Sequence, residues 1–312
     1  MGAGAVQFGL QLPWTGHLAT RDDMAAYARA AEHLGYGWVS AGEHLIYPKA
    51  LRARHPRNGD LPIDASSPSH DPFTTFAWLA GQTTTLRFLT GVLLVPLRPA
   101  LVTAKLVAGL DFVSGGRLTL GVGTGWMEDE FDVLGVEFAE RGPRTDDHLA
   151  ALRSLFEGDG PHDGPWSSFP ESWFEPKPVQ SPLPIVVGGG AVDPVLRRVA
   201  RHGQGWWPYP LAAAEIAAAM PRLAEAMAAE GREGEQLEVH TYLVLALDGQ
   251  ELDEGLRRRL VDKVDAAARA GVTHMTLTMG ELGGPYGRLP LERLVEAAGW
   301  FAREVAPTAP AG

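Results

Sequence analysis

The stretch from Leu86 to Gly135 limits the possible folds of this chain more than any other segment. Its apolar residues predict one strand over Leu86–Val92 and a second over Arg117–Val122, with an amphipathic helix and the turn Ser114–Arg117 between them. Strands that are connected through a helix run parallel, because tight two-residue turns join only antiparallel strands. Both strands therefore end at the same edge of one sheet, which is the edge where α/β proteins bind their ligands.

The same alternation of strand and helix continues from one end of the chain to the other. Eight strand–helix units follow one another without a break in composition, and an α/β barrel takes roughly 250 residues. We therefore predict a single (β/α)8 TIM barrel over residues 1–304, with loop insertions at its C-terminal face, rather than a doubly wound fold of two domains. The predicted strands are Val6–Leu12, Gly37–Gly42, Leu86–Val92, Arg117–Val122, Leu183–Val187, Gly205–Pro208, Leu237–Leu247 and Val272–Met279.

The connections between these strands carry signals of their own. Thr20 and Asp23 match the pattern that caps the start of a helix. The polar loop that ends at Asp71 and the segment Asp159–Ser181, which is rich in glycine, proline and aromatic residues, are the expected insertions. Residues 305–312 are expected to form a flexible tail. The helix after the third strand has an apolar face, of the kind that packs on a core. This face comprises Val102, Leu106, Gly109, Leu110 and Val113.

Composition excludes several classes of function. The formal net charge of -11 argues against nucleic acid or an anionic membrane as the main partner. The chain has no cysteine, which excludes disulfides, thiolate nucleophiles and cysteine metal ligands. No apolar run approaches the roughly 18 residues of a membrane span and no signal-peptide pattern is present, so we expect a cytoplasmic protein. No metal site is predicted, because His70-Asp71 and His162-Asp163 have no partner at metal-ligand spacing.

Glu43 and His44 stand where the second predicted strand ends, at the face of a barrel that holds the active site. Side chains alternate along a strand, so apolar Val39 and Ala41 on the outside would turn His44 toward the lumen. His44 is therefore a candidate for proton transfer, although an isolated histidine is more often structural or on the surface. Glu43 is expected to form an ion pair rather than to carry a proton.

Two glycine-rich turns are candidates for cofactor binding. The run Gly121–Trp126 lacks the spacing of a dinucleotide-binding loop and suits a flat wall against a planar ring, or simply a tight turn. Acidic residues 128–130 after it are expected to cap a short helix. The turn Gly188–Gly190 precedes a helix, and free N–H groups at a helix start can bind a phosphate. Arg197 and Arg198 follow one turn later and could assist or be solvated.

Taken together, these residues resemble the bacterial luciferase-like monooxygenase superfamily, in particular its branch that uses the deazaflavin coenzyme F420. The matching segments run in order through about two-thirds of the chain. They are Leu34–Val39, Gly42–His44, Thr90–Val92, Leu110–Arg117, Leu120–Trp126, Glu130-Phe131, Pro176–Gln180, Pro184–Gly189 and Gly205-Trp206. The combination is specific for the superfamily and less so for the choice between F420 and FMN.

The resemblance implies roles for individual residues. His44 matches a histidine beside the isoalloxazine ring, Gly91-Val92 matches a non-prolyl cis peptide that supports this ring, and Gly188–Gly190 match the phosphate-binding turn. Trp126 stands where sugar-phosphate dehydrogenases of the family carry a carboxylate, which argues against that activity. Gln204 replaces an aspartate usual in the family. The predicted cofactor-binding residues are Thr90, Gly91, Val92, Gly121, Gly123, Gly125, Trp126, Gly188, Gly189 and Gly190.

The resulting hypothesis is an F420-dependent oxidoreductase that transfers a hydride between C5 of the deazaflavin and a small organic substrate, with His44 as the catalytic residue. One alternative is an FMN-dependent monooxygenase that receives reduced flavin from a partner reductase. Another is a barrel that binds the cofactor without catalysis. The resemblance further implies a homodimer. The sequence carries no recognisable substrate signature.

Overall fold

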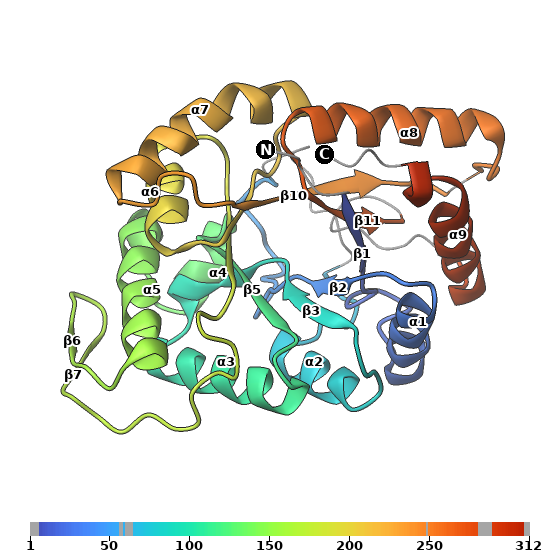
Figure 1. The fold of residues 1–312 in the computed structure, drawn as a ribbon. Coiled ribbons are helices and arrows are strands. Elements are labelled where there is room, and N and C mark those ends of the chain that lie inside the picture. The colour runs from blue at the N-terminus through green and yellow to red at the C-terminus, as the bar shows by residue number, and fades with distance from the viewer. Residues whose placement is uncertain (1–5, 56–58, 60–64, 248, 280–288, 309–312) are drawn as a thin grey trace.

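Strands and helices alternate regularly in the computed structural model, which describes residues 6–55, 59, 65–247, 249–279 and 289–308. In these ranges eight parallel strands close into a barrel, and helices surround it (Figure 1). The predicted TIM barrel is therefore confirmed. The barrel strands are β1 Gln7–Gln11, β2 Trp38–Ala41, β3 Arg87–Thr90, β5 Leu118–Gly123, β8 Ile185–Gly188, β9 Gly205–Trp207, β10 Glu238–Val244 and β11 His274–Thr278.

Neighbouring strands follow the order β3-β2-β1-β11-β10-β9-β8-β5, and β3 pairs with β5 to close the ring. All of these pairs are parallel, with Phe88 opposite Leu118 at the closure. Because every strand runs the same way, all their carboxyl ends meet at one face of the barrel. The predicted strands agree with the observed ones to within a few residues, except for the third.

The third predicted strand is interrupted. β3 ends at Thr90, the peptide bond between Gly91 and Val92 is cis, and a separate short strand β4 covers Leu93–Leu94. β5 pairs with β3 through Leu118 and Thr119, and with β4 through Val122 and Gly123. The break shifts the register with β5 by one residue, since Phe88 pairs with Leu118 before it and Leu93 with Val122 after it. The cis peptide agrees with what the family resemblance implies.

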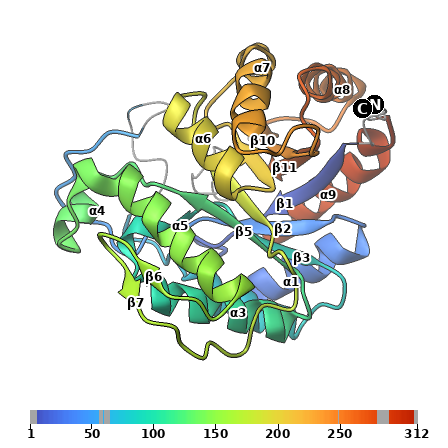
Figure 2. The ribbon, with the colours of Figure 1, turned by 60° about the vertical axis from the view of Figure 1, so that its left-hand side comes forward.

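The main helices fill the connections and cover the outside of the barrel (Figure 2). Thr20 caps α1 as predicted, since its hydroxyl oxygen accepts the N–H of Asp23 at 3.1 Å. Asp71 caps α2 in the same way through the N–H of Thr74. The helices are α1 Arg21–His33, α2 Pro72–Ala80, α3 Ala100–Ser114, α4 Glu128–Val133, α5 Arg141–Glu157, α6 Asp193–His202, α7 Ala213–Ala229, α8 Glu254–Arg269 and α9 Leu291–Glu304.

Only part of the predicted inward face of α3 is buried, because Leu110 is 3% exposed but the valines of that face lie outside. Val102 and Val113 are 54% and 59% exposed, whereas Ala104 and Ala108 are fully buried. Apolar residues occupy most of the circumference of this helix, so periodicity alone could not select the buried side. Small residues face the barrel because they let the helix approach the strands closely. The large residues left outside are Leu101, Val102, Leu106, Phe112 and Val113.

Two insertions depart from the regular pattern, as expected. One is the loop between β2 and α2, and the other follows α5 and contains the hairpin of β6 (His162–Asp163) and β7 (Ser168–Phe169). The expected flexible tail covers residues 305–312. In the structure Val305 is buried and 306–308 form a 3-10 helix, so the start of this segment is ordered, while 309–312 lie outside the described residues. Among the described residues, no helix combines the length and hydrophobicity needed to span a bilayer.

Candidate active site

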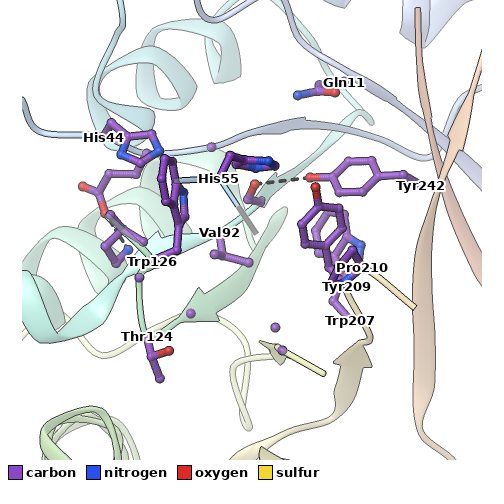
Figure 3. Close-up of a pocket in the computed structure, with 18 of the residues that line it drawn as sticks. Gln11, His44, His55, Val92, Thr124, Trp126, Trp207, Tyr209, Pro210 and Tyr242 are labelled. Atoms are coloured by element: carbon purple, nitrogen blue, oxygen red, sulfur yellow. Dashed lines mark hydrogen bonds between the residues drawn. The ribbon is translucent and has the colours of Figure 1, made fainter. Parts of the chain in front are cut away.

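A cavity of about 270 Å³ opens at the carboxyl ends of the strands. The carboxyl ends of six barrel strands with the connections after them, together with Tyr242 inside β10, contribute to its wall, so residues far apart in the sequence face one space (Figure 3). The volume approaches the roughly 300–1,000 Å³ of small-molecule sites. The lining residues are Gln11, Trp14, Gly42, Glu43, His44, Tyr47, His55, Gly91, Val92, Leu94, Gly123, Thr124, Gly125, Trp126, Gly188, Gly189, Trp207, Tyr209, Pro210 and Tyr242.

His44 lies in this wall and is held by a buried carboxylate. Its Nδ1 is 2.9 Å from Oε2 of Glu130, whose side chain is fully buried. The other oxygen of Glu130 accepts the backbone N–H groups of Leu45 at 2.5 Å and Ile46 at 3.3 Å. Because a carboxylate that accepts these donors is an acceptor for His44 as well, Nδ1 carries the proton. Nε2 is then the ring nitrogen that can exchange a proton with a ligand.

The acidic residues at the start of α4 do not cap that helix, contrary to our prediction. Met127 occupies the N-cap without a side-chain hydrogen bond, and Asp129 turns toward the β2–α2 loop. Asp129 accepts the N–H of Ala53 at 2.7 Å and both the backbone N–H and Nε–H of Arg52. These bonds lower the pKa of Asp129 to about 2, with the Ala53 N–H as the largest cause. Asp129 and Glu130 thus fasten the loop beside the pocket.

Glu43 forms an ion pair, as predicted. Its carboxylate accepts Nε–H of Arg98 at 2.6 Å and the backbone N–H of Leu94 at 2.7 Å. Arg98 also binds Asp71, the capping residue of α2. Burial raises the pKa of Glu43, and the Arg98 guanidinium opposes this effect. The pair connects the end of β2, β4 and the start of α2, so it fixes the backbone that follows the cis peptide.

Glycines form the wall next to the cis peptide because side chains would not fit there. A Cβ on Gly123 would lie 2.5 Å from Cγ2 of Val92, and one on Gly188 would lie 3.1 Å from Cγ1 of the same side chain. Val92 consequently projects between β5 and β8. Figure 3 shows it between the side chains of His44 and Trp126 and those of Trp207 and Tyr242. This arrangement presents one branched side chain and exposed backbone to a ligand.

Three of the predicted cofactor-binding residues lie outside the cavity wall. Thr90 is buried, and its hydroxyl donates to the carbonyl of Gly121 at 2.7 Å. A Cβ on Gly121 would lie 1.9 Å from the carbonyl oxygen of Thr90, so this glycine allows β3 and β5 to approach. Gly190 follows the two glycines that do line the cavity, and no atom lies within 4 Å of its Cβ position. Gly91, Val92, Gly123, Gly125, Trp126, Gly188 and Gly189 are in the wall.

The remaining wall is aromatic, and most of it was not predicted from the sequence. His55 packs edge-on against Trp126 at 5.1 Å, and Trp207 packs on Tyr242 at 4.8 Å. The Tyr242 hydroxyl donates to the carbonyl of Gly91 at 3.3 Å, and burial raises the pKa of Tyr242. Trp207 and Tyr242 could have been found by taking lumen-facing residues near the carboxyl ends of strands. His55 lies in a loop, where no periodic signal exists.

The described residues of the cavity wall include no lysine or arginine. Arg198, a candidate for phosphate binding, is buried and paired with Asp146 at 2.5 Å, and Arg197 is exposed. Gln204, which replaces the aspartate usual at its position, accepts Arg153 at 2.7 Å and the N–H of Ile185 at 3.0 Å. These bonds support the start of β8, so Gln204 supplies a structural acceptor.

A closed barrel with a cis peptide and a carboxylate-bound histidine at its ligand-binding face narrows the class of protein considerably. The family model described as luciferase-like monooxygenase matches residues 4–300, and the chain belongs to this family. An uncharacterized protein of Mycobacterium tuberculosis, Rv0953c, is 31% identical over 86% of this chain and 92% of its own length.

Relatives with named activities use two different cofactors. The FMNH2-dependent dimethylsulfone monooxygenase of Pseudomonas putida is 28% identical over 65% of this chain and 56% of its own length. Among solved structures, an F420-dependent secondary alcohol dehydrogenase bound to an F420–acetone adduct superposes with a TM-score of 0.77. It is 15% identical, and the match covers 98% of this chain and 99% of that one. This likeness concerns the fold.

Proposed function

We propose that the protein is an F420-dependent oxidoreductase that transfers a hydride between C5 of the deazaflavin and a small organic substrate. The pairing of His44 with Glu130 inside the cavity carries this proposal. Hydride transfer to or from a carbonyl or alcohol requires a proton at the oxygen atom, and a positioned histidine can provide or accept it. The buried carboxylate fixes the tautomer, so Nε2 is the atom that performs this step.

The cavity fits a flat heteroaromatic ring. Backbone at Gly91, Gly123 and Gly188 and the side chain of Val92 form one part of the wall, and aromatic side chains flank this part on both sides. When bound, the deazaflavin supplies the hydride chemistry, and the protein orients it and excludes water. Gly188–Gly190 precede α6, so we assign the cofactor phosphate to the end of this turn, beyond the N–H of Gly189, which donates to the carbonyl oxygen of Trp207 at 3.0 Å. Trp126 packs edge-on at 5.8 Å against His44 and lies on the proposed substrate side.

An FMN-dependent oxygenase is the second candidate, and a specific observation supports it. Two curated relatives at 28% identity are described as a flavin-dependent and an FMNH2-dependent monooxygenase. In this alternative, a partner reductase would provide reduced FMN. The aromatic wall would then serve to keep water away from the oxygen-reactive ring.

Binding of both cofactors separates the two candidates. The purified chain is titrated with F420 and with FMN, each oxidised and reduced, and the dissociation constants are compared. Our proposal predicts tight F420 binding and weak FMN binding, and the opposite ranking would refute it. A candidate set of alcohols and ketones is then assayed with the F420-loaded protein.

The variant His44→Ala tests whether the barrel catalyses or merely binds. We expect the F420 dissociation constant to change little and turnover to fall by roughly two orders of magnitude or more. Unchanged turnover would remove His44 from the catalytic role. F420 binding without a hydride acceptor or donor, across the substrate set, would instead support the non-catalytic alternative.

We further propose that the protein is a cytoplasmic homodimer. The support is the row of large apolar residues on the outer side of α3, where Phe112 is 60% exposed and Val113 59%. Monomeric proteins seldom expose a contiguous apolar patch of this kind. A second copy of the same helix would bury it, because a two-fold interface pairs a patch with itself.

A further inference from the structure

Three potential metal ligands meet at the opposite end of the barrel from the cavity. Glu238 is the first residue of β10, His240 is two residues further on, and His274 is the first residue of β11. His240 stands directly opposite His274 in the strand register. Because side chains alternate along a strand, Glu238 and His240 share a face with Tyr242, which lines the cavity. The three side chains therefore point into the lumen near its amino-terminal mouth.

Their spacing is close to that of a coordination sphere. Nε2 of His240 lies 2.9 Å from one oxygen of Glu238, and Nε2 of His274 lies 3.8 Å from the other. One ligand atom from each residue lies within 4.8 Å of the other two. Ligands around a tetrahedral zinc ion, with bonds of about 2.0–2.1 Å, are about 3.3 Å apart. Side-chain adjustments of about 1 Å would bring all three onto one cation.

The surroundings of both histidines suit this role. Nδ1 of His274 lies 2.8 Å from the hydroxyl oxygen of Thr273, which also reaches the carbonyl of Val239. When the Thr273 hydroxyl donates its proton to the Val239 carbonyl, its oxygen can accept Nδ1–H of His274. Nε2 of His274 then carries the lone pair that can bind a cation. The His240 side chain is 3% exposed, yet its Nδ1 has no hydrogen-bond partner among the described residues. Without a cation, Nε2–H of His240 donates to Glu238 at 2.9 Å, so binding through Nε2 requires the proton to leave this atom, and the unpartnered Nδ1 is the ring nitrogen that can carry it.

The charge of the Glu238 carboxylate and its exposure to solvent also favour the binding of a cation. Glu238 is 42% exposed at its side chain, so an ion can reach the cluster from the solvent at this end. Arg87 is the nearby cation, and its guanidinium bonds to Gly116, Leu118, Thr119 and Gln180 rather than to Glu238. The carboxylate is therefore available to neutralise a divalent cation.

We propose that Glu238, His240 and His274 form a binding site for a divalent transition-metal ion of the zinc type. Two imidazoles and one carboxylate are the donors that such ions prefer, whereas magnesium and calcium prefer oxygen ligands. The site joins two neighbouring strands at the end of the barrel away from the cavity. A cation there stabilises the folded chain, because the unfolded chain does not hold the three ligands together.

Binding of Zn²⁺ to the metal-stripped full chain tests the proposal by calorimetry, and Co²⁺ supplies a visible spectrum that reports tetrahedral coordination. We expect one ion per chain, and Glu238→Gln and His274→Gln should each weaken Zn²⁺ binding about tenfold or more. The matched control is His33→Gln, since His33 is exposed on α1 and should leave binding unchanged. Zn²⁺ should raise the melting temperature of the wild type and not that of Glu238→Gln.

Several outcomes would overturn the metal site. These are the absence of stoichiometric binding, binding that survives both ligand substitutions, and a Co²⁺ spectrum typical of octahedral oxygen ligands. Because Glu238 is partly exposed, Glu238→Gln should fold, and circular dichroism without metal verifies this. The result is independent of the F420 proposal, since the two sites lie at opposite ends of the barrel and the readout is metal binding.

Discussion

At the residue scale, the side chain of Glu130 holds three separate groups in place. Its carboxylate accepts Nδ1–H of His44 and two consecutive backbone N–H groups, and the side chain is fully buried. A buried charge is stable only when its hydrogen-bonding capacity is met, and here three donors meet it. We therefore regard Glu130 as a positioning residue that acts through His44.

Glu130→Gln tests this role. The amide keeps the shape of the side chain but lacks the charge, and its NH2 group cannot accept the donors that the carboxylate accepts. We expect kcat with the F420-loaded protein to fall about 10- to 100-fold with little change in KM, and the pH profile of kcat to shift. Steady-state kinetics across pH measures both effects.

The control for this experiment is Glu128→Gln, because Glu128 lies in the same turn of α4 and is exposed. It should leave both kcat and its pH profile as in the wild type. A Glu130→Gln enzyme with an unchanged pH profile and a raised KM would mean that Glu130 supports only the loop.

At the scale of elements, α3 shows why a helix can be located from sequence while its orientation is not. The strands and the helices that connect them follow from periodic patterns and from a cap such as Thr20. The inward face of α3 does not, because the hydrophobic residues around it exceed what the barrel can bury. Three consecutive acidic residues in α4 likewise match a capping pattern, although Asp129 and Glu130 serve residues about 80 positions away in the sequence.

The outer face of α3 leads to a prediction about assembly. The double variant Leu106→Asp with Val113→Asp places two charges on the exposed apolar row and leaves the barrel-facing side unchanged. We expect the dimer to dissociate into folded monomers, because an interface core does not tolerate unpaired charges. Sedimentation equilibrium measures the molar mass, and circular dichroism verifies the fold.

Val179→Asp is the matched control, since Val179 is 56% exposed but lies outside α3. It should remain dimeric. If the wild type is itself monomeric at all concentrations, the proposed homodimer is wrong. If the α3 variant stays dimeric, then another surface forms the interface.

For the whole molecule, stability should depend on pH through a buried histidine. Burial lowers the pKa of His202 to about 4, below the 6.5 of an exposed imidazole. Asp146 raises this pKa, and the three arginines that face the ring lower it further. These arginines are Arg153, Arg198 and Arg201. Between pH 6.5 and 4 the unfolded chain binds a proton at this position and the folded chain does not.

The free energy of unfolding should therefore fall as the pH falls through this window, by at most about 3 kcal/mol from this group. Urea unfolding at several pH values measures the slope. His202→Gln removes the titration and should flatten the curve, whereas His33→Gln, at an exposed position, should not. Parallel curves for the wild type and His202→Gln would contradict the assignment.

The global architecture and the glycine-lined part of the cavity wall could be predicted because they depend on strand order and on local glycine patterns. The cluster of Glu238, His240 and His274 could not, because β10 and β11 are separated by α8 in the sequence and are adjacent only in the barrel. The same reason explains the missed contacts of Trp207 and Tyr242. In a parallel barrel, side chains that act together often lie on neighbouring strands that are far apart in the sequence.

The carboxylate of Glu130 also has a consequence for the timing of turnover. Residues 45 and 46 follow His44 in the chain, and their N–H groups donate to Oε1 of Glu130, whose other oxygen accepts from the histidine. A movement of this segment that admits a molecule would remove these two hydrogen bonds from Glu130. The carboxylate would then hold the His44 ring less firmly. In the proposed reaction, His44 would therefore not be fixed as a proton donor while the pocket is open.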